Sequence, residues 1–361
     1  MVLEPIRHGR RRCLGMALAA GAATLANPGR SARAAEVSPA AADLLKKTIS
    51  VDAHSHAQGM IFGTNATDAL TRSMRAGNIS AVCLAHVPDG PVIGRGPGGV
   101  LGKVREPAPG ALYKGHLERL AWAERLSREH GLKRVLSAAD LSEAKAAGQP
   151  AIIHDIEGCD FLDGKPERLE EAHKLGARVI QLVHYIPNDI GDYQTGMVTH
   201  KGMTDFGAKV IQELNRLGIL VDVAHATEDL VRGALKVSSK PLLLSHTALA
   251  GSAAQGQTPL AGRQVSREHA KAVADAGGVI GIWHFFRDID RYVGGIREMV
   301  DVVGVDAVCI GTDQQVSKGC LQDYADFGLL ADALLKGGFT PDEAGKILGG
   351  NFVRVFGKAT G

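Results

Sequence analysis

Short apolar runs, each bounded by glycine, proline or charged residues, recur eight times along the chain. They are rich in β-branched residues and are apolar almost throughout, without regular alternation with polar residues. Continuous apolar character predicts parallel strands that are buried on both faces of a sheet. The eight runs are Thr48–His54, Ile79–Val87, Pro150–Gly158, Arg178–Tyr185, Gly218–His225, Pro241–Thr247, Gly277–Phe285 and Asp306–Asp313.

Helical patterns lie between these runs. His116–Gly131 and Thr204–Gly218 carry apolar residues at intervals of three and four, and both end in glycine. The segment Thr340–Glu343 has the pattern of a capping box with proline at the first helical position, which predicts a helix that ends near Gly349-Gly350. Eight strands alternating with helices over about 310 residues predict a (β/α)8 TIM barrel with insertions. Residues Pro88–Gly115 form the longest insertion, which we interpret as a loop beside the site, since its glycine-rich stretch GRGPGG lacks the lysine of a phosphate-binding loop.

The first 34 residues resemble an export signal. Arg10-Arg11-Arg12 precede the apolar run Leu14–Ala26, and Ala32–Ala34 supplies small residues suited to cleavage. The stretch RRCLG in particular resembles a twin-arginine signal. The apolar run is too short to span a bilayer, and no later segment reaches about 18 uninterrupted apolar residues. We therefore predict a periplasmic protein without a permanent membrane anchor, in which residues 35–361 form one catalytic domain.

Charge and cysteine content narrow the class of protein further. Removal of residues 1–34, with six arginines and one glutamate, lowers the formal net charge from +2 to −3. A nearly neutral protein lacks the basic field that nucleic acid requires, so no nucleic-acid partner is predicted. Export permits disulfides among Cys83, Cys159, Cys309 and Cys320. Cys83 and Cys309 lie in predicted buried strands, however, where we expect free thiols in the core at least as much as disulfides.

Side chains that bind metals or carry protons mark the carboxyl ends of the predicted strands. In a (β/α)8 barrel these ends meet on one face, where catalytic groups gather. Histidines with one or two carboxylates are a ligand set suited to zinc or a similar divalent ion. Two ions sharing a bridging carboxylate could polarise a carbonyl and convert a bound water into hydroxide. The strand-end residues are His54, His56, His86, Glu157, His184, His225, His246, His284 and Asp313.

The pair His54 and His56 depends on this wider pattern. Two positions apart in an extended strand, the two imidazoles point to the same face, but such pairs also occur on surface strands. The convergence of strand ends favours metal ligands. Glu157 is the candidate bridge between two ions, with a helix cap or loop carboxylate as the alternative. Asp313 is a candidate general base or partner of a substrate ammonium group.

Four further polar residues have weaker predictions. His86 and His284 lie at the same rim, and the sequence favours neither contact with substrate nor its absence. His154 and Asp155 lie inside the third predicted strand, so we expect them to support the fold or the ligands rather than to react.

With these motifs in order, the chain resembles the membrane dipeptidase family, also called renal dipeptidase or peptidase family M19, within the amidohydrolase-like metal barrels. The resemblance runs from about Val51 to Phe356. The matching motifs are VDAHSH, IEG followed by LGARVIQLVHYIPND, GMTDFGAKVIQELNRLGILVDVAH, PLLLSHT, GRQVSREHAKAVADAGGVIGI, GTD and GGFTPDEAGKILGGNFVRVFG.

The resemblance implies a role for each site residue and a homodimer as a common assembly. His184 would contact the substrate carbonyl or the tetrahedral intermediate, Arg263 would receive the dipeptide carboxylate, and Asp313 would hold the free amine and handle the proton. A surface arginine in a loop is the alternative for Arg263. Two zinc ions per chain are implied, with His54, His56 and Glu157 on the first and Glu157, His225 and His246 on the second.

The sequence departs from the family pattern at two places. His56 stands where the family usually has aspartate, which leaves the metal pair with one more positive charge. The segment after Asp313 lacks the family's usual aromatic and acidic residues. The predicted function is a zinc-dependent hydrolase that cleaves the peptide bond of dipeptides. The alternatives are an enzyme acting on another small amide or a lactam, and a catalytically degenerate binding protein.

Overall fold

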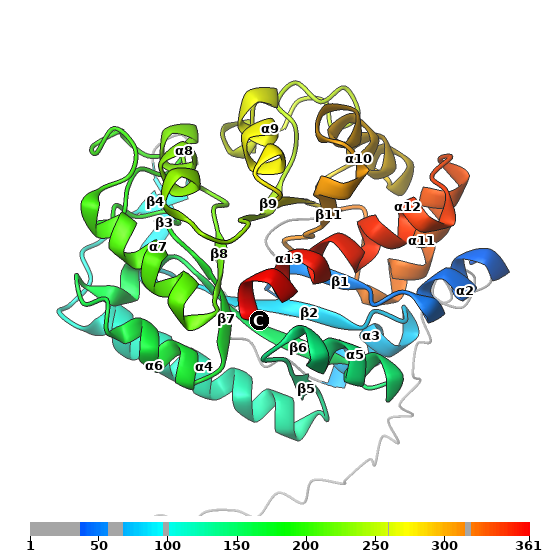
Figure 1. The fold of residues 1–361 in the computed structure, drawn as a ribbon, viewed down its shortest axis with the longest axis horizontal. Helices are drawn as coiled ribbons and strands as arrows, with labels where there is room; N and C mark the ends of the chain where they lie inside the picture. The colour runs from blue at the N-terminus through cyan, green and yellow to red at the C-terminus, as the bar shows by residue number, and fades with distance from the viewer. Residues whose placement is uncertain (1–36, 57–67, 97–100, 259, 315–318) are drawn as a thin grey trace, which may run out of the picture. The chain divides into compact units, whose positions relative to one another are not determined.

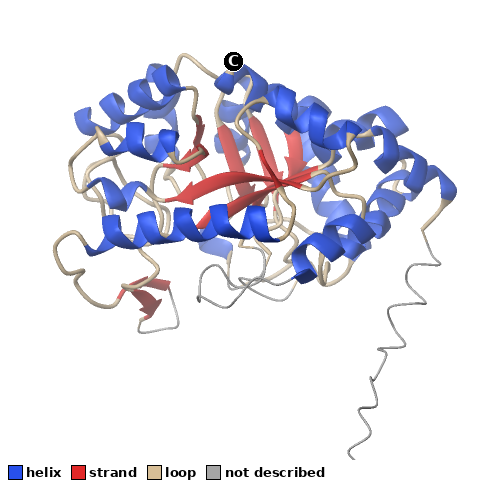
Figure 2. Ribbon diagram, turned by 90° about the horizontal axis from the view of Figure 1, so that it is seen from below, coloured by secondary structure: helices blue, strands red, loops and turns tan. Residues whose placement is uncertain are grey.

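Eight parallel strands form a nearly closed barrel in which neighbours follow the chain, in the order β1-β2-β6-β7-β8-β9-β10-β11. The computed structural model describes residues 37–56, 68–96, 101–258, 260–314 and 319–361. Figures 1 and 2 show the strands in the middle of this compact unit, Val37–Gly361, with helices around them. Each of the eight predicted runs overlaps one barrel strand, so the predicted (β/α)8 barrel is confirmed.

The strands and helices have the following bounds. The barrel strands are β1 Val51–Ser55, β2 Ala81–His86, β6 Ala151–Glu157, β7 Ala177–Gln181, β8 Leu220–Asp222, β9 Leu243–Thr247, β10 Val279–Ile282 and β11 Val308–Ile310. Outside the ring lie β3 Ile93–Arg95, β4 Leu101–Lys103 and β5 Lys133–Arg134. The α-helices are α2 Pro39–Lys47, α3 Asp68–Ala76, α4 Ala111–Glu129, α5 Ala138–Ala146, α6 Arg168–Lys174, α7 Asp205–Leu217, α8 Glu228–Val237, α9 Arg267–Asp275, α10 Ile289–Val303, α11 Phe327–Lys336, α12 Pro341–Gly345 and α13 Asn351–Thr360.

The barrel closes where the chain after β11 returns to β1. Ser55 and Gln314 form an isolated parallel bridge, and the Asp313 N–H donates to the His54 carbonyl oxygen at 2.9 Å. The buried Asp52 carboxylate accepts the backbone N–H of Thr312 at 2.8 Å. These bonds join the first and last strands at their carboxyl ends, so the residues that follow both strands are held on one rim.

The opposite end of the barrel is covered by α13. Phe352 and Phe356 on this helix pack in one buried cluster with Val51, Ala81 and Val279 from the beginnings of three strands. Figure 1 shows α13, in red, crossing the strands at this end. Apolar packing here leaves the carboxyl ends of the strands as the open, polar face of the barrel.

The capping and glycine signals correctly mark the following helix boundaries. Thr204 and Gly218 flank α7 as its caps, and the capping box of Thr340 with Glu343 starts α12. The predicted end near Gly349-Gly350 is confirmed, because Gly349 has the non-helical angles φ 171° and ψ −24° and separates the segment that begins with α12 from α13, which starts at Asn351. A Cβ on Gly349 would lie 2.1 Å from the Ile49 carbonyl oxygen, so this glycine also permits close packing against a distant segment.

The insertion after β2 is more regular than predicted. Within Pro88–Gly115, β3 and β4 form a two-stranded antiparallel hairpin, and α4 begins at Ala111 rather than at His116. Gly94 and Gly102 are the middle pair of the hairpin. Because glycine has no side chain, the alternation of apolar and polar residues that predicts a strand is absent here.

Asp192 organises the loop between β7 and α7. Its buried carboxylate accepts the backbone N–H groups of Thr199 at 2.7 Å, His200 at 2.9 Å and Gly202 at 3.0 Å. Burial alone would raise the pKa of Asp192, but these N–H groups outweigh it and lower the pKa from 3.8 to about 2. The ionised carboxylate therefore stabilises the folded loop.

We expect Asp192→Asn to destabilise the protein by about 2 kcal/mol at neutral pH, since one pKa unit corresponds to about 1.4 kcal/mol. The native pKa is depressed, so this stability is present above pH 4 and is lost as pH falls from about 4 towards 2. Urea unfolding between pH 7 and pH 3 measures the difference in the free energy of unfolding between the wild type and the variant. A difference that stays constant over this range would contradict the role of the ionised carboxylate.

Within the described residues, no helix is both long enough and apolar enough to cross a membrane. Cys83, Cys159, Cys309 and Cys320 are free buried thiols. The predicted signal, residues 1–34, lies outside the described residues and stays a prediction.

Candidate metal centre

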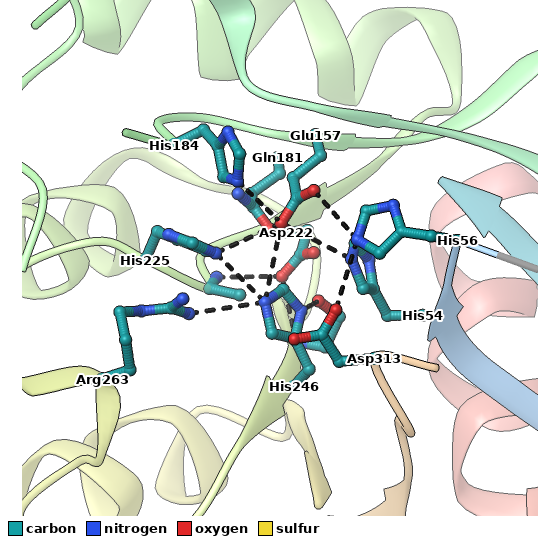
Figure 3. A network of polar contacts seen from close by, with 12 residues as sticks. His54, His56, Glu157, Gln181, His184, Asp222, His225, His246, Arg263 and Asp313 are labelled. Atoms are coloured by element: carbon teal, nitrogen blue, oxygen red, sulfur yellow. Dashed lines mark hydrogen bonds and ion pairs between the residues drawn. The ribbon is translucent and has the colours of Figure 1, made fainter. Parts of the chain in front are cut away.

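All eight residues to which we assigned a catalytic, binding or metal-ligand role gather at the carboxyl ends of the barrel strands. Figure 3 shows them around a central carboxylate, that of Glu157. Two of them lie in β1 and directly after it, one at the end of β6 and one in β9. Three follow β7, β8 and β11, and the last lies in the loop between β9 and α9. These residues are His54, His56, Glu157, His184, His225, His246, Arg263 and Asp313, all of them buried.

Glu157 is the centre of the cluster because five imidazoles face its carboxylate. Oε1 lies 3.1 Å from Nε2 of His225 and 3.3 Å from Nε2 of His184. The corresponding distances from Oε1 to His54 and His246 are 3.5 and 3.6 Å, and Oε2 lies 3.4 Å from His56. Burial alone would raise the pKa of Glu157, but the surrounding imidazoles, first that of His184, outweigh it and hold the pKa well below its usual range. The carboxylate is therefore kept ionised.

Backbone geometry brings several of these groups inward. His225 and Asp313 have positive φ angles of 65° and 53°, a region that residues other than glycine seldom adopt. Gly281 and Gly311 lie beside the β9 strand that carries His246, and a Cβ on either would meet the Ser245 carbonyl oxygen at less than 2 Å. Strained turns after β8 and β11, together with close strand packing, thus place the side chains of the site.

Two groups of three ligand atoms share Glu157. His54, His56 and Glu157 form one group, and Glu157, His225 and His246 form another, with the ligand atoms of each within 4.8 Å of one another. A third group of the same compactness contains Asp313 with His54 and His246. Imidazole nitrogens and carboxylate oxygens suit zinc and related divalent ions.

Unsatisfied buried atoms show that a cation fits this centre. Among the described residues, Nε2 of His54 and Oε2 of Glu157 are buried without a hydrogen-bond partner. Nε2 of His225 and Nε2 of His246 lie only 3.1 Å apart. Burial, followed by nearby positive charge, lowers the pKa of both imidazoles, so they present neutral lone pairs. A metal ion would satisfy these atoms, and neutral imidazole is the form that binds metals.

Residues behind the candidate ligands orient the imidazoles. Asp155 Oδ2 lies 2.8 Å from Nδ1 of His54, and Ser245 Oγ lies 2.9 Å from Nδ1 of His246. In both rings Nε2 is thereby directed towards Glu157. Partners of this kind set the ring orientation of metal-bound histidines. The predicted supporting role of Asp155 is consistent with this contact.

Arg263 reaches the same centre from a short 3-10 turn, Ala261–Arg263. Its guanidinium donates to Gln194 Oε1 at 3.2 Å and to the Tyr185 hydroxyl at 3.4 Å. It also lies 3.4 Å from Nε2 of His246. Arg263 is 4% exposed, so the alternative of a surface arginine is wrong.

His86 and His284 do not line the described part of the cavity above Glu157. Nε2 of His86 lies 3.0 Å from Nδ1 of His116, on α4, while both ring nitrogens of His284 are buried without partners among the described residues. The cavity has a volume of about 300 Å³. Its lining comprises His56, Gly90, Ile93, Gly94, Arg95, Leu101, Glu157, His184, Tyr185, His225 and Asp313.

Three residues near the site were not predicted from sequence. Tyr185 lines the cavity, Gln194 accepts a hydrogen bond from Arg263, and Asp89 contacts His184. Asp89 follows β2 by three residues, so a carboxylate close after a strand end was the available signal. Tyr185 and Gln194 carry no comparable pattern.

A (β/α)8 barrel with clustered histidines and carboxylates at the carboxyl ends of its strands defines the class of metal-dependent hydrolases of the amidohydrolase type. Residues 40–360 match the model of the membrane dipeptidase family, peptidase family M19. The chain belongs to this family, which confirms the resemblance found from its motifs.

Individual relatives are more distant. Dipeptidase 3 of Mus musculus is 26% identical over 223 residues, which cover 57% of this chain and 44% of that relative, so the match spans less than half the relative's length. The probable dipeptidase PvdM from Pseudomonas aeruginosa superposes with a TM-score of 0.75 at 17% identity, covering 89% of this chain and 97% of that one. A metallopeptidase from Rhodobacter sphaeroides, bound to a phosphinate mimic of L-Ala-D-Ala, superposes with a TM-score of 0.71 at 18% identity, covering 87% and 100%. These two structures support the fold.

Proposed function

We propose that this protein is a zinc-dependent dipeptidase that holds two zinc ions bridged by Glu157. The single observation that carries the proposal is the position of the Glu157 carboxylate, which two compact histidine groups share. Family membership and the mouse relative's name support the choice of a dipeptide substrate. We extend the proposal to export through the arginine-rich N-terminus and to a homodimer, both on sequence grounds alone.

The chemistry divides between the metals and the chain. When bound, the ions would polarise the amide carbonyl and supply a water acidic enough to attack at neutral pH. His184 lines the cavity with Nε2 facing Glu157, which suits it to contact the carbonyl oxygen as charge develops there. Asp313, whose Oδ1 lies 3.2 Å from Nε2 of His56, faces the same space and is placed to carry a proton to the leaving amine.

Arg263 is the proposed receptor for the free carboxylate of a dipeptide. A guanidinium presents a planar fork of donors that matches a carboxylate. Gln194 and Tyr185 accept hydrogen bonds from two of its nitrogens, so the fork is oriented before substrate arrives. Preorganisation of this kind lowers the ordering cost of binding.

A panel of dipeptides with free and blocked ends tests the function. We expect the zinc-loaded protein to cleave L,L or L,D dipeptides only when both termini are free, with N-acetylated and C-amidated versions resistant. Hydrolysis is measured by release of free amino acids. Two bound metals without cleavage of any dipeptide would contradict the proposal and favour another amide or a lactam as substrate.

Arg263→Gln should raise KM for cleaved dipeptides by at least about tenfold, because a charge-assisted pair contributes about 1.5–3 kcal/mol. Arg267→Gln is a matched control, since Arg267 begins α9 just after the same loop and does not line the described cavity. An unchanged KM in Arg263→Gln would remove Arg263 from substrate binding.

A further inference from the structure

The cavity above Glu157 has two walls of different chemistry. The barrel ends supply one wall, which consists of residues of the candidate metal centre, His184, Asp313 and Tyr185. The second wall comes from the segment that follows β2 and is mainly aliphatic and glycine. The proposed mechanism uses the first wall and gives the second no role. The residues of the second wall are Gly90, Ile93, Gly94, Arg95 and Leu101.

The β3–β4 hairpin turns one face towards this cavity. Figure 2 shows the hairpin as a separate pair of short strands outside the barrel. Opposed residues of an antiparallel pair share a face, and the faces alternate along each strand. Arg95 is paired with Leu101, and Ile93, two positions before Arg95, lies on the same face. This face therefore presents two aliphatic side chains and one guanidinium to the cavity.

Hydrogen bonds hold the hairpin beside the site. The Asp89 carbonyl oxygen, in the turn after β2, accepts the N–H groups of Val92 at 2.9 Å and Ile93 at 3.2 Å. The buried carboxylate of the same residue accepts the Tyr185 N–H at 3.2 Å. At the other end of the hairpin, the Val104 N–H donates to the Val92 carbonyl oxygen at 2.9 Å. The second wall is thus tied to the first and is formed before a ligand arrives.

Leu101 contributes apolar surface that the protein itself does not pack. Ile93 is half-buried against a small cluster of Val92, Leu112 and Ile186. Leu101 is also half-buried, but it belongs to none of the apolar clusters among the described residues. An apolar group of a bound ligand would cover this surface, and removal of such surface from water favours binding.

Arg95 is the competing determinant on the same face, since a guanidinium would favour an acidic side chain. Arg95 is exposed, whereas Ile93 and Leu101 are half-buried. Water screens the attraction of an exposed charge but does not weaken apolar contact in the same way. The half-buried aliphatic pair is therefore the stronger determinant of which side chain this wall accepts.

We propose that Ile93 and Leu101 form a subsite for an aliphatic side chain of the substrate, so that the enzyme prefers dipeptides with a leucine-like residue. This inference rests on the proposed dipeptidase function and names its substrate class. The alternative is a hairpin that only shields the metal centre and makes no contact with the substrate side chains.

A panel of dipeptides tests the preference in the zinc-loaded full chain. The panel is Ala-Ala, Leu-Ala, Ala-Leu, Glu-Ala and Ala-Glu, each in L,L and L,D form. We expect one leucine isomer to exceed Ala-Ala and both glutamate isomers in kcat/KM by at least about tenfold, since one methylene in an apolar pocket changes this value by about 10- to 200-fold. Equal values for alanine and leucine substrates would overturn the proposal. A preference for glutamate would also overturn it and would assign the wall to Arg95.

Two substitutions of Leu101 assign the preference to the hairpin. Leu101→Ala should lower the ratio of kcat/KM between the preferred leucine substrate and Ala-Ala by at least about threefold, since several methylenes of apolar contact are lost. Leu101→Lys should reverse the order of the leucine and glutamate substrates, because it places a charge at the same position. A uniform loss of activity with unchanged ratios would show a merely structural role.

Val104→Ala is the matched control. Val104 is another aliphatic residue of the hairpin segment, is 52% exposed and does not line the described cavity. It lies on the other face, where a Cβ on Gly94 would be 3.2 Å from its side chain. The ratio of leucine to alanine substrates should stay at the wild-type value. A fall as large as that in Leu101→Ala would show a general effect of the hairpin and overturn the specific role of Leu101.

Binding of uncleavable phosphinate mimics of Ala-Ala, Leu-Ala and Ala-Leu separates the subsite from the dipeptidase function. By calorimetry, one leucine mimic should bind zinc-loaded wild type at least about tenfold more tightly than the Ala-Ala mimic. This difference should shrink in Leu101→Ala. Such a difference in affinity without cleavage of any dipeptide would support the subsite and contradict the dipeptidase function. Equal affinities for the three mimics would overturn the subsite even if dipeptides are cleaved.

Discussion

Glu157→Gln should lower dipeptide turnover by at least about a thousandfold and reduce bound metal from two ions per chain to at most one. The reason is geometric, because the two candidate ligand groups share only this carboxylate. A neutral amide has one acceptor oxygen in place of two and carries no charge to offset two cations. Loss of an essential group in a shared catalytic unit has effects of this size.

Metal analysis of the purified variant, together with its turnover at saturating zinc, provides the measurement. Glu298→Gln is a suitable control, since Glu298 on α10 accepts the Ala254 N–H at 3.0 Å and does not line the cavity. This control should keep both metals and full activity. Two tightly bound ions in Glu157→Gln would show that another residue bridges the metals or that the sites are separate.

Asp313→Asn should lower kcat by about a hundred- to ten-thousandfold while metal content stays close to that of the wild type. Asp313 lines the cavity, and its carboxylate contacts His56 at 3.2 Å. An amide cannot take up and release a proton at neutral pH, and loss of general acid–base catalysis has this magnitude. Backbone strain is not a concern, because asparagine tolerates the left-handed conformation in which Asp313 lies at φ 53°.

The control for this substitution is Asp163→Asn. Asp163 also has a positive φ angle, 45°, but pairs with Arg168 outside the cavity. Its substitution should leave kcat unchanged. If metal content falls together with activity in Asp313→Asn, Asp313 is a ligand, as its grouping with His54 and His246 allows. Unchanged activity would remove Asp313 from the mechanism.

Local patterns in the chain predicted most of the barrel. Each strand is a short, nearly continuous apolar run, and burial between barrel interior and helices requires this composition at every strand. The polar residue at each strand end was equally visible, because the open rim is the only place on such a strand where a histidine or carboxylate meets the site. Glu157 could therefore be chosen as the candidate bridge before its five imidazole partners were known.

Glycine takes part in contacts that the sequence pattern does not reveal. Gly349 marks the predicted break in the helix, but its missing side chain also leaves room for the Ile49 carbonyl oxygen of a distant segment. The Gly94 and Gly102 pair likewise hides the β3–β4 hairpin, since glycine carries no hydrophobic pattern. Local rules treat glycine as a break in structure, and they cannot represent close contact with residues far away in sequence.

The sequence by itself determined the barrel, the residue types at its rim and the family, because these depend on short-range hydrophobic patterning and on motif order. Tertiary structure alone decided which of those residues meet. The hydrogen bond from His184 to Asp89, the clamp of Gln194 and Tyr185 on Arg263, and the separation of His86 from the cavity depend on loop paths and side-chain directions. Contacts of this kind are set by the packing of the whole barrel, which no single segment of the chain encodes.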